Sequence, residues 1–315
     1  MQGQFDHDFG ASGSDGASPR PLIGVFGSAN MDLVVRVDTP PEPGETVFGQ
    51  SFMTVPGGKG LNQAVAAARA GGYVQFIGCV GDDAFGDQLV AILDAEGISR
   101  PGLRRVPGPT GTAHITVDQA GQNSIIVVPA ANNLVGAGDL TEDLAGQLDW
   151  FVTQLELPEI AVRGALGRAR RLGVRTVLTP APARQLTDDL LRTVDLLVPN
   201  QIEAGVLTGL SNPSDAAAQL STLCGDVVVT LGGDGALWAR GGEVVASIPA
   251  RSVPVVDTTA AGDTFVGVLV AELAVGKGFA EALDVATVAA GIAVGRAGAT
   301  ASMPSQREIS QARGR

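Results

Sequence analysis

Short runs of β-branched and aliphatic residues alternate along this chain with segments whose apolar residues recur at helical spacing. The strand-like runs include 22–26, 74–80, 150–155, 176–179 and 227–231, and the helix-like segments include 61–70, 85–96, 159–172, 262–274 and 279–296. Strands that alternate with helices form a mostly parallel sheet covered by helices on both faces. We therefore predict an α/β fold, a three-layer αβα sandwich, whose ligands bind beyond the carboxyl ends of the strands.

A second set of strand-like runs has no helical partners. Residues 33–37 and 46–52 read as two strands joined by a proline-rich connection, and residues 112–117 and 123–128 read as a hairpin. We expect all four to form one small sheet that projects from the main body as a lid. The lid would comprise residues from about 31–56 and 110–128, inserted in a single domain over 21–304.

Composition limits the possible functions. The chain has 315 residues, 45% of them hydrophobic, and a formal net charge of −12. This charge argues against nucleic-acid binding, although backbone amides and local basic groups can still bind an anionic substrate. No apolar stretch is long enough to span a membrane, and the two cysteines lack metal-binding spacing. We expect a cytoplasmic protein, with a disordered tail at 1–20 and a C-terminal tail at 305–315.

Residues 253–265 contain the most informative local pattern. Val253–Val256 reads as a strand end, small residues follow, and a helix begins at Gly262. The first amides of a helix have no internal partner and lie at the positive end of its dipole, so they can hold a phosphate. Asp263, in the first turn, is either a base that takes a proton from an attacking hydroxyl or only a cap of the helix.

Two further glycine-rich turns follow the same logic. Gly57–Asn62 opens a helix but lacks Walker spacing, so it is either a cradle for a small polyhydroxylated molecule or a plain helix-start turn. Thr230–Gly235 follows a buried strand, and its amides suit the phosphates and ribose of a nucleotide. The same loop also fits a hairpin turn, and both descriptions can hold together.

Polar side chains at strand ends complete the candidate site. Asn200 and Glu203 share one face at the start of a helix, where they either hold Mg²⁺ through water or form a capping box. Glu156 ends a buried strand, and a carboxylate there is costly unless it binds something. We therefore expect Glu156 to contact a ligand.

With these motifs assembled, the chain resembles the ribokinase-like carbohydrate kinases, the PfkB family, from about Val25 to Pro304. The motifs that carry the resemblance, in chain order, are Gly27–Asp32, Pro43–Thr46, Gly57–Asn62, Gln154–Glu156, Pro180–Arg184, Pro199–Glu203 and Asp257–Phe265. Each motif is weak alone, and their joint order makes the match specific.

The resemblance implies a role for each matching position. The sugar would be held by Asn30, Asp32, Gly58, Lys59, Asn62 and Glu156. Asp263 would be the catalytic base, and the amides of Ala260, Ala261 and Gly262 would form the anion hole. ATP would be bound by Asn200, Thr230, Leu231, Gly232, Gly233, Asp234, Gly235, Gly262 and Thr287. Asn200 and Glu203 would lie near Mg²⁺.

The resemblance also implies a monovalent cation, usually potassium, beside the anion hole. Its ligands would come from Asp257, Thr259, Ala293, Arg296, Gly298 and Ser302. Three of these positions lie where the last long helix ends and presents free carbonyls, although Gly298 also fits an ordinary C-cap. One departure is visible: related kinases often carry a histidine near the adenine where this chain has Thr287. By resemblance, the lid sheet would also pair two subunits into a homodimer.

The implied activity is transfer of the γ-phosphoryl group of ATP to the 5-hydroxyl of D-ribose, giving D-ribose 5-phosphate and ADP. Three alternatives stay open. The first is a kinase of the same fold whose acceptor is deoxyribose, a nucleoside or a ketose, because a few hydrogen bonds decide between sugars. A regulator that binds sugar or nucleotide without catalysis is disfavoured by Asp263 and its turn. A dinucleotide-dependent dehydrogenase is disfavoured because no Gly-x-Gly-x-x-Gly follows the first strand.

Overall fold

The computed structural model describes residues 20–314, so the predicted disordered tail lies outside the described residues except for Arg20. Its main feature is a nine-stranded sheet in the order β13-β12-β11-β10-β9-β8-β1-β4-β5. Its strands are β1 (Leu22–Phe26), β4 (Tyr73–Gly81), β5 (Ser99–Val106), β8 (Trp150–Thr153), β9 (Arg175–Leu178), β10 (Leu196–Leu197), β11 (Asp226–Thr230), β12 (Ala236–Arg240) and β13 (Glu243–Ile248). The strands from β5 to β11 pair in parallel, and β12 and β13 add an antiparallel edge.

Helices cover both faces of this sheet, as the alternation of elements predicted. Successive strand residues point to opposite faces, so in β1 Val25 joins one core and Phe26 the other. The first face is covered by α1 (Lys59–Arg69), α2 (Ala84–Ala95), α8 (Ala261–Ala274), α9 (Phe279–Val294) and α10 (Gln306–Arg313). The second is covered by α3 (Glu142–Ala145), α4 (Glu159–Arg171), α5 (Asp188–Leu191), α6 (Gln201–Thr208) and α7 (Pro213–Leu220). Short 3-10 turns lie at η1 (Ala130–Leu134), η2 (Ala137–Asp139), η3 (Gly232–Asp234) and η4 (Thr300–Ser302).

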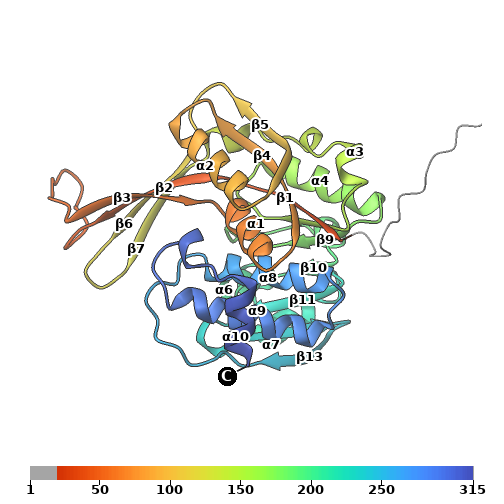
Figure 1. The fold of residues 1–315 in the computed structure, drawn as a ribbon. Helices are drawn as coiled ribbons and strands as arrows, with labels where there is room; N and C mark the ends of the chain where they lie inside the picture. The colour runs from red at the N-terminus through yellow and green to blue at the C-terminus, as the bar shows by residue number, and fades with distance from the viewer. Residues whose placement is uncertain (1–19, 315) are drawn as a thin grey trace, which may run out of the picture.

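A separate four-stranded sheet, in the order β3-β2-β6-β7, extends from one side of the body (Figure 1). It consists of β2 (Asn30–Arg36), β3 (Ser51–Gly57), β6 (Gly111–Val117) and β7 (Asn123–Val128). The predicted hairpin is confirmed, and it joins the first pair through parallel pairing of β2 with β6. We call this sheet the lid.

One lid strand was predicted in the wrong place. The sequence indicated a strand over 46–52, but β3 runs from Ser51 to Gly57 and residues 46–50 form no strand. Pro56 lies inside this strand, although proline is uncommon in strand interiors. Because β3 lies at the edge of the lid, Pro56 needs no inward N–H and is tolerated within the strand.

Two other segments also differ from expectation. Val253–Val256 is not a strand: Pro254 has no N–H, and the Val256 amide donates to Val294 O at the end of α9. The segment predicted as a C-terminal tail contains α10, whose Ile309 is buried in the core. Among residues 20–314, no helix combines the length and the apolar character needed to span a bilayer.

Candidate active site

The site forms where the N-termini of α1 and α8 meet, beyond the carboxyl ends of the central strands. Helix α1 begins directly after the Gly57-Gly58 turn, where Gly58 has a φ of 88°. A Cβ atom on Gly58 would lie 2.8 Å from the Asn30 amide nitrogen, so only glycine permits both this backbone conformation and this close approach. The turn therefore holds the start of α1 against the first residue of β2.

Asp263 lies at the centre of the site and is 7% exposed. Its Oδ2 accepts a hydrogen bond from Asn62 Nδ2 at 3.1 Å, and its Oδ1 accepts one from Gln63 Nε2 at 3.0 Å. The N-cap of α8 is Ala260, and no side chain caps this helix. Asp263 is therefore not the helix cap that the sequence left open as an alternative; its carboxylate points across to α1.

The residues predicted to hold the sugar are gathered on the side of Asp263 that faces the lid. Glu156 Oε2 accepts hydrogen bonds from Ser28 Oγ at 2.5 Å and from the Lys59 amide at 3.1 Å. Asn30 Oδ1 accepts a hydrogen bond from Asn132 Nδ2 at 2.7 Å. Asp32 lies directly beside Gly57, because a Cβ atom there would be 2.2 Å from Asp32 Oδ2. The structure thus brings together all six predicted sugar-binding positions: Asn30, Asp32, Gly58, Lys59, Asn62 and Glu156.

Electrostatics mark this cluster as a site for a polar ligand. Burial, together with the nearby charges of Glu156 and Asp263, raises the pKa of Asp32 to about 7. The carboxylate of Asp263 raises the pKa of Lys59 against the opposing effect of burial, so Lys59 is an ammonium ion. Carboxylates crowded around one ammonium repel one another. This repulsion is offset when the hydroxyl groups of a ligand donate hydrogen bonds to them.

The turn before α8 supplies unpaired amides next to Asp263. Ala260 has a φ of 58°, in the left-handed region that alanine rarely adopts. Ala261 N–H donates to Thr258 O at 3.3 Å, but within the described part of the chain the amides of Ala260, Gly262 and Asp263 donate to no protein oxygen. Such amides at a helix N-terminus form a binding place for an anion.

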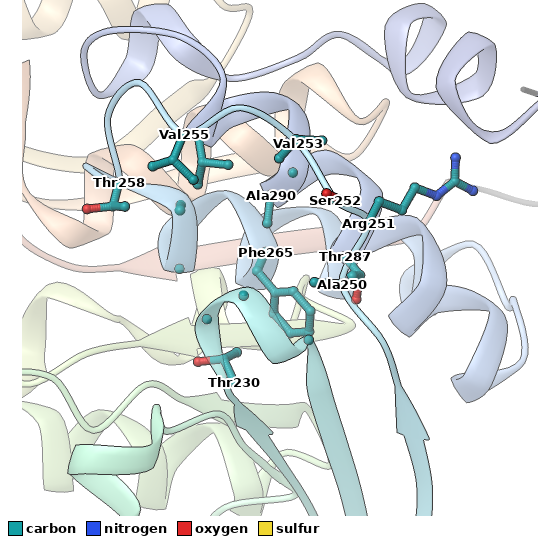
Figure 2. A pocket seen from close by; sticks show the side chains of 17 residues that line it. Thr230, Ala250, Arg251, Ser252, Val253, Val255, Thr258, Phe265, Thr287 and Ala290 are labelled. Atoms are coloured by element: carbon teal, nitrogen blue, oxygen red, sulfur yellow. The ribbon is translucent and has the colours of Figure 1, made fainter.

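A cavity of about 420 Å³ adjoins this turn (Figure 2). It is lined by the predicted residues Thr230, Gly232, Gly233, Gly235, Gly262 and Thr287. Leu231 and Asp234, also predicted there, do not line it. The loop forms a hairpin between β11 and β12, so the turn and the cavity lining coexist. Thr287 is buried, and its hydroxyl donates to Leu283 O.

Sequence reasoning missed much of this cavity. Its lining also includes segment 250–258, with Val253 and Val255 among its residues, and the side chain of Phe265, while Arg251 points away (Figure 2). The β-branched residues of this segment were interpreted as a strand end, which hid their role. A single sequence also gave no signal for Gln63 and Asn132, because their partners lie more than 100 residues away.

A smaller cavity connects the two halves of the site. It is lined by Lys59, Asn200, Glu203, Thr230, Gly262 and Asp263, among others. Asn200 and Glu203 form the capping box of α6: Asn200 Oδ1 accepts from the Glu203 amide, and Glu203 Oε2 accepts from the Asn200 amide, each at 2.8 Å. Glu203 Oε1 stays free of these bonds. Burial raises the pKa of Glu203, partly offset by the Asn200 N–H and by Lys59.

Asn200 and Glu203 fit Mg²⁺ only if the phosphates of a bound nucleotide supply further ligands to the ion. Within residues 20–314 no group of three or more His, Cys, Asp or Glu side chains could hold a metal ion by itself. Mg²⁺ usually keeps several waters and binds proteins through one or two carboxylates plus substrate phosphates. Glu203 lines the connecting cavity and uses only its Oε2 in the capping box, which matches that mode.

The segments predicted to hold potassium also come together. Asp257 Oδ1 accepts from the Thr259 amide at 2.9 Å, and Asp257 Oδ2 accepts from the Gly298 amide at 3.0 Å. Although burial opposes the charged form, these bonds hold the pKa of Asp257 below its ordinary value. Helix α9 ends at Val294 with Gly295 as C-cap, so Gly298 is not the cap. The Asp257 amide also donates to Val294 O, the last carbonyl of α9, so an anionic carboxylate and the carbonyl end of a helix adjoin, which fits a monovalent cation. The Ala293 carbonyl accepts from the Arg296 amide, and the buried Ser302 hydroxyl donates to Ala299 O. The Arg296 side chain instead pairs with Glu308.

A buried carboxylate next to unpaired helix amides, with a nucleotide-sized cavity on one side and a polar cluster on the other, defines an α/β phosphotransferase. A model of the pfkB family of carbohydrate kinases matches residues 20–306. A ribokinase from Haemophilus influenzae is 38% identical over 298 residues, which cover 92% of this chain and 97% of that protein.

Two solved structures extend the comparison. A ribokinase from Thermotoga maritima superposes with a TM-score of 0.87 at 35% identity, covering 94% of this chain and 100% of that one. A ribokinase from Arabidopsis thaliana, complexed with ribose and ATP, gives a TM-score of 0.86 at 31% identity and covers 93% and 98% of the two chains. This chain belongs to the pfkB family of carbohydrate kinases, which confirms the resemblance carried by its motifs.

Proposed function

We propose that this protein transfers the γ-phosphoryl group of ATP to the 5-hydroxyl of D-ribose, giving D-ribose 5-phosphate and ADP. The observation that carries the proposal is the position of Asp263, between a polar cluster facing the lid and unpaired amides facing a cavity. Similarity to proteins named ribokinase, one of them bound to ribose and ATP, supports ribose as the acceptor.

Each side chain then has a distinct task. Asn30, Asp32, Asn62 and Glu156 bind the sugar hydroxyls, and Asn62 Oδ1, which is buried without a partner, is available to accept one. Asp263 takes the proton of the 5-hydroxyl as the oxygen attacks phosphorus in line. The unpaired amides at the start of α8 stabilise the charge that develops on the phosphoryl oxygens, and the Lys59 ammonium adds to that stabilisation.

The nucleotide occupies the cavity beneath segment 250–258, with Thr230 and the following glycines against its phosphates and ribose. Mg²⁺, when bound through Glu203 and the phosphates, supplies positive charge that neutralises the transferring group. Asp257 and the carbonyl end of α9 would hold a monovalent cation, which would neutralise the carboxylate beside the turn that carries the anion hole.

The lid closes the sugar side and carries the contact between two subunits. Phe52 and Ile126, on its outer strands, lie on one face of the lid and are both exposed, which is unusual for large apolar side chains of a monomer. We propose that a second copy of the chain covers them, giving a homodimer. Both cysteines, Cys79 and Cys224, are free and buried, which supports a location in the reducing cytoplasm.

The test is ADP release by the purified protein with Mg-ATP and, separately, ribose, deoxyribose, fructose or adenosine, each in potassium and in sodium buffer. Ribose-dependent turnover with a higher kcat/KM than for the other acceptors is expected, and potassium is expected to raise the rate. Higher kcat/KM with another acceptor would replace ribose as substrate. Absence of turnover with all four would overturn the proposed function.

A further inference from the structure

Gln63 is buried in the site, but sugar and nucleotide binding assign it no task. It lies on α1 directly after Asn62 and is 1% exposed. Its Nε2 donates to Asp263 Oδ1 at 3.0 Å and to Thr179 Oγ1 at 3.3 Å. Because its side chain is enclosed, it cannot touch a substrate, and any effect it has must pass through Asp263.

A second glutamine fixes which way the Gln63 amide points. Gln154 Nε2, at the end of β8, donates to Gln63 Oε1 at 2.6 Å. A carboxylate only accepts hydrogen bonds, so Asp263 requires the nitrogen of Gln63 on its side. The oxygen of Gln63 then faces Gln154, which must present its own nitrogen. If either amide turned over alone, two acceptors or two donors would face each other.

The two donors on Asp263 differ in what else they do. Asn62 Oδ1 is buried and has no hydrogen-bond partner among residues 20–314, so Asn62 is shared between Asp263 and the sugar. Every polar atom of Gln63 is already bonded within the protein. Gln63 is therefore the contact that keeps the carboxylate in one rotamer whether or not a sugar is bound.

We propose that Gln63, oriented by Gln154, is the positioning residue for the catalytic carboxylate of Asp263. The inference rests on the proposed kinase function and deepens it. A base must lie within hydrogen-bond reach of the attacking hydroxyl, and a displacement of about 1 Å can lower the rate on the order of 100-fold. Without Gln63, Asp263 keeps one donor and can rotate away from the line of attack.

The experiment compares Gln63→Met with Gln75→Met in steady-state kinetics and thermal unfolding. Methionine keeps the length of glutamine but cannot donate. Gln75 is also a buried glutamine, lies in β4, and is not among the residues within 20–314 that donate to the Asp263 carboxylate. We expect Gln63→Met to lower kcat roughly 10- to 100-fold with KM for ribose and ATP within about threefold. Gln75→Met should retain wild-type kcat.

A double variant separates positioning from general damage to the core. Gln154 acts only through Gln63, so Gln154→Met is expected to lower kcat severalfold alone and not at all in a Gln63→Met background. Independent losses that multiply, or unchanged kcat in Gln63→Met, would overturn the inference. If Gln63→Met does not melt cooperatively, the kcat of Gln154→Met tests the inference instead. An unchanged kcat in Gln154→Met would show that Gln154 does not position Asp263 through Gln63. A wild-type protein that phosphorylates no sugar would instead refute the proposed function, so the two failures are distinguishable.

Discussion

Two adjacent residues of one helix, Asn62 and Gln63, each donate a hydrogen bond to one oxygen of Asp263. Their amides replace the water that would otherwise solvate a carboxylate that is 7% exposed. The carboxylate is thus prepared before a substrate arrives, which is the condition for efficient proton transfer.

Replacing that carboxylate tests its role directly. Asp263→Asn should lower kcat by roughly 100- to 10,000-fold, because general-base catalysis contributes a factor of that size. Ribose should still bind, since Asn30, Asp32 and Glu156 are intact. Single-turnover kinetics and calorimetric titration with ribose measure the two quantities separately. Turnover equal to wild type would remove Asp263 from the mechanism.

The titration of Asp32 predicts how the free energy of unfolding depends on pH. Its pKa is about 7 in the folded protein against an ordinary 3.8, so the folded state binds the proton more tightly than the unfolded state. The free energy of unfolding therefore falls as pH rises from about 4 to about 7. Asp32→Asn carries no charge at any pH, so it should be more stable than wild type at pH 8, by roughly 2–4 kcal/mol, and similar at pH 4.

The same variant should bind ribose more weakly, with a KM about 10-fold higher or more, because a charged acceptor is lost. Urea unfolding at pH 4, 6 and 8 measures the stability, and ADP release measures the KM. A stability difference that does not change with pH would contradict the predicted titration of Asp32.

At the scale of elements, the contact between α1 and α8 sets the geometry of the site. A Cβ atom at Gly267, one turn after Asp263, would lie 2.6 Å from both Ala66 Cβ and Gln63 O. Gly267→Ala should therefore push α8 from α1, destabilise the protein by about 1–3 kcal/mol and lower kcat. Thermal unfolding and steady-state kinetics measure both effects.

The matched control is Gly167→Ala in α4. Gly167 also lies inside a helix, but the nearest atom to an added Cβ is Arg171 Nη1 at 4.0 Å. This variant should gain about 0.5–1 kcal/mol from helix propensity and keep its activity. If Gly267→Ala behaved like this control, the close packing of α1 on α8 would not be what positions Asp263.

Elements with strong local patterns were predictable, and contacts between distant elements were not. Helix α8 begins one residue before its predicted start, and the hairpin of β6 and β7 was predicted within one residue. Strand β3 was misplaced because a proline inside a strand is tolerated at the edge of a sheet, and the edge position of β3 is known only from the tertiary structure. Val253–Val256 was misread as a strand end because its hydrogen-bond partner, the end of α9, is contributed by tertiary structure.

Some residues of the candidate site were also recognisable from the local sequence, and others were not. Asp263 and the two glycine-rich turns stand out locally, because unusual residues occur at the start of a helix or after a buried strand. Gln63, Gln154 and Asn132 look like ordinary polar residues in the sequence. Their importance arises only from partners far along the chain: Asn132 and Asn30 are 102 residues apart, and Gln154 and Gln63 are 91 apart.

At the scale of the whole molecule, the exposed apolar side chains of the lid predict that the protein is a dimer. Register places Ile126 opposite His114 and Leu33, on the face of the lid that is not shared with Asp32. Ile126 is 69% exposed. Ile126→Lys should convert the proposed dimer to a monomer, because an unpaired charge in an apolar interface is costly. Light scattering coupled to size-exclusion chromatography measures the mass.

Ile160→Lys is the matched control, because Ile160 is also exposed but lies on α4, away from the lid. It should leave the mass unchanged. A wild-type protein that is monomeric at micromolar concentration would contradict the dimer, and a dimer that survives Ile126→Lys would place the interface elsewhere.

The joining of α1 to α8 also has a consequence for how the protein is made. Asn62 leaves the ribosome 201 residues before Asp263, and the apolar face of α1 has no cover on its outer side until α8 is synthesised. All the strands of the main sheet are synthesised before α8, but the first core stays open until the segment from Ala261 onward emerges. The sugar site therefore cannot form before α8 is synthesised, and a chain that ends before α8 leaves the apolar face of α1 exposed, which favours aggregation.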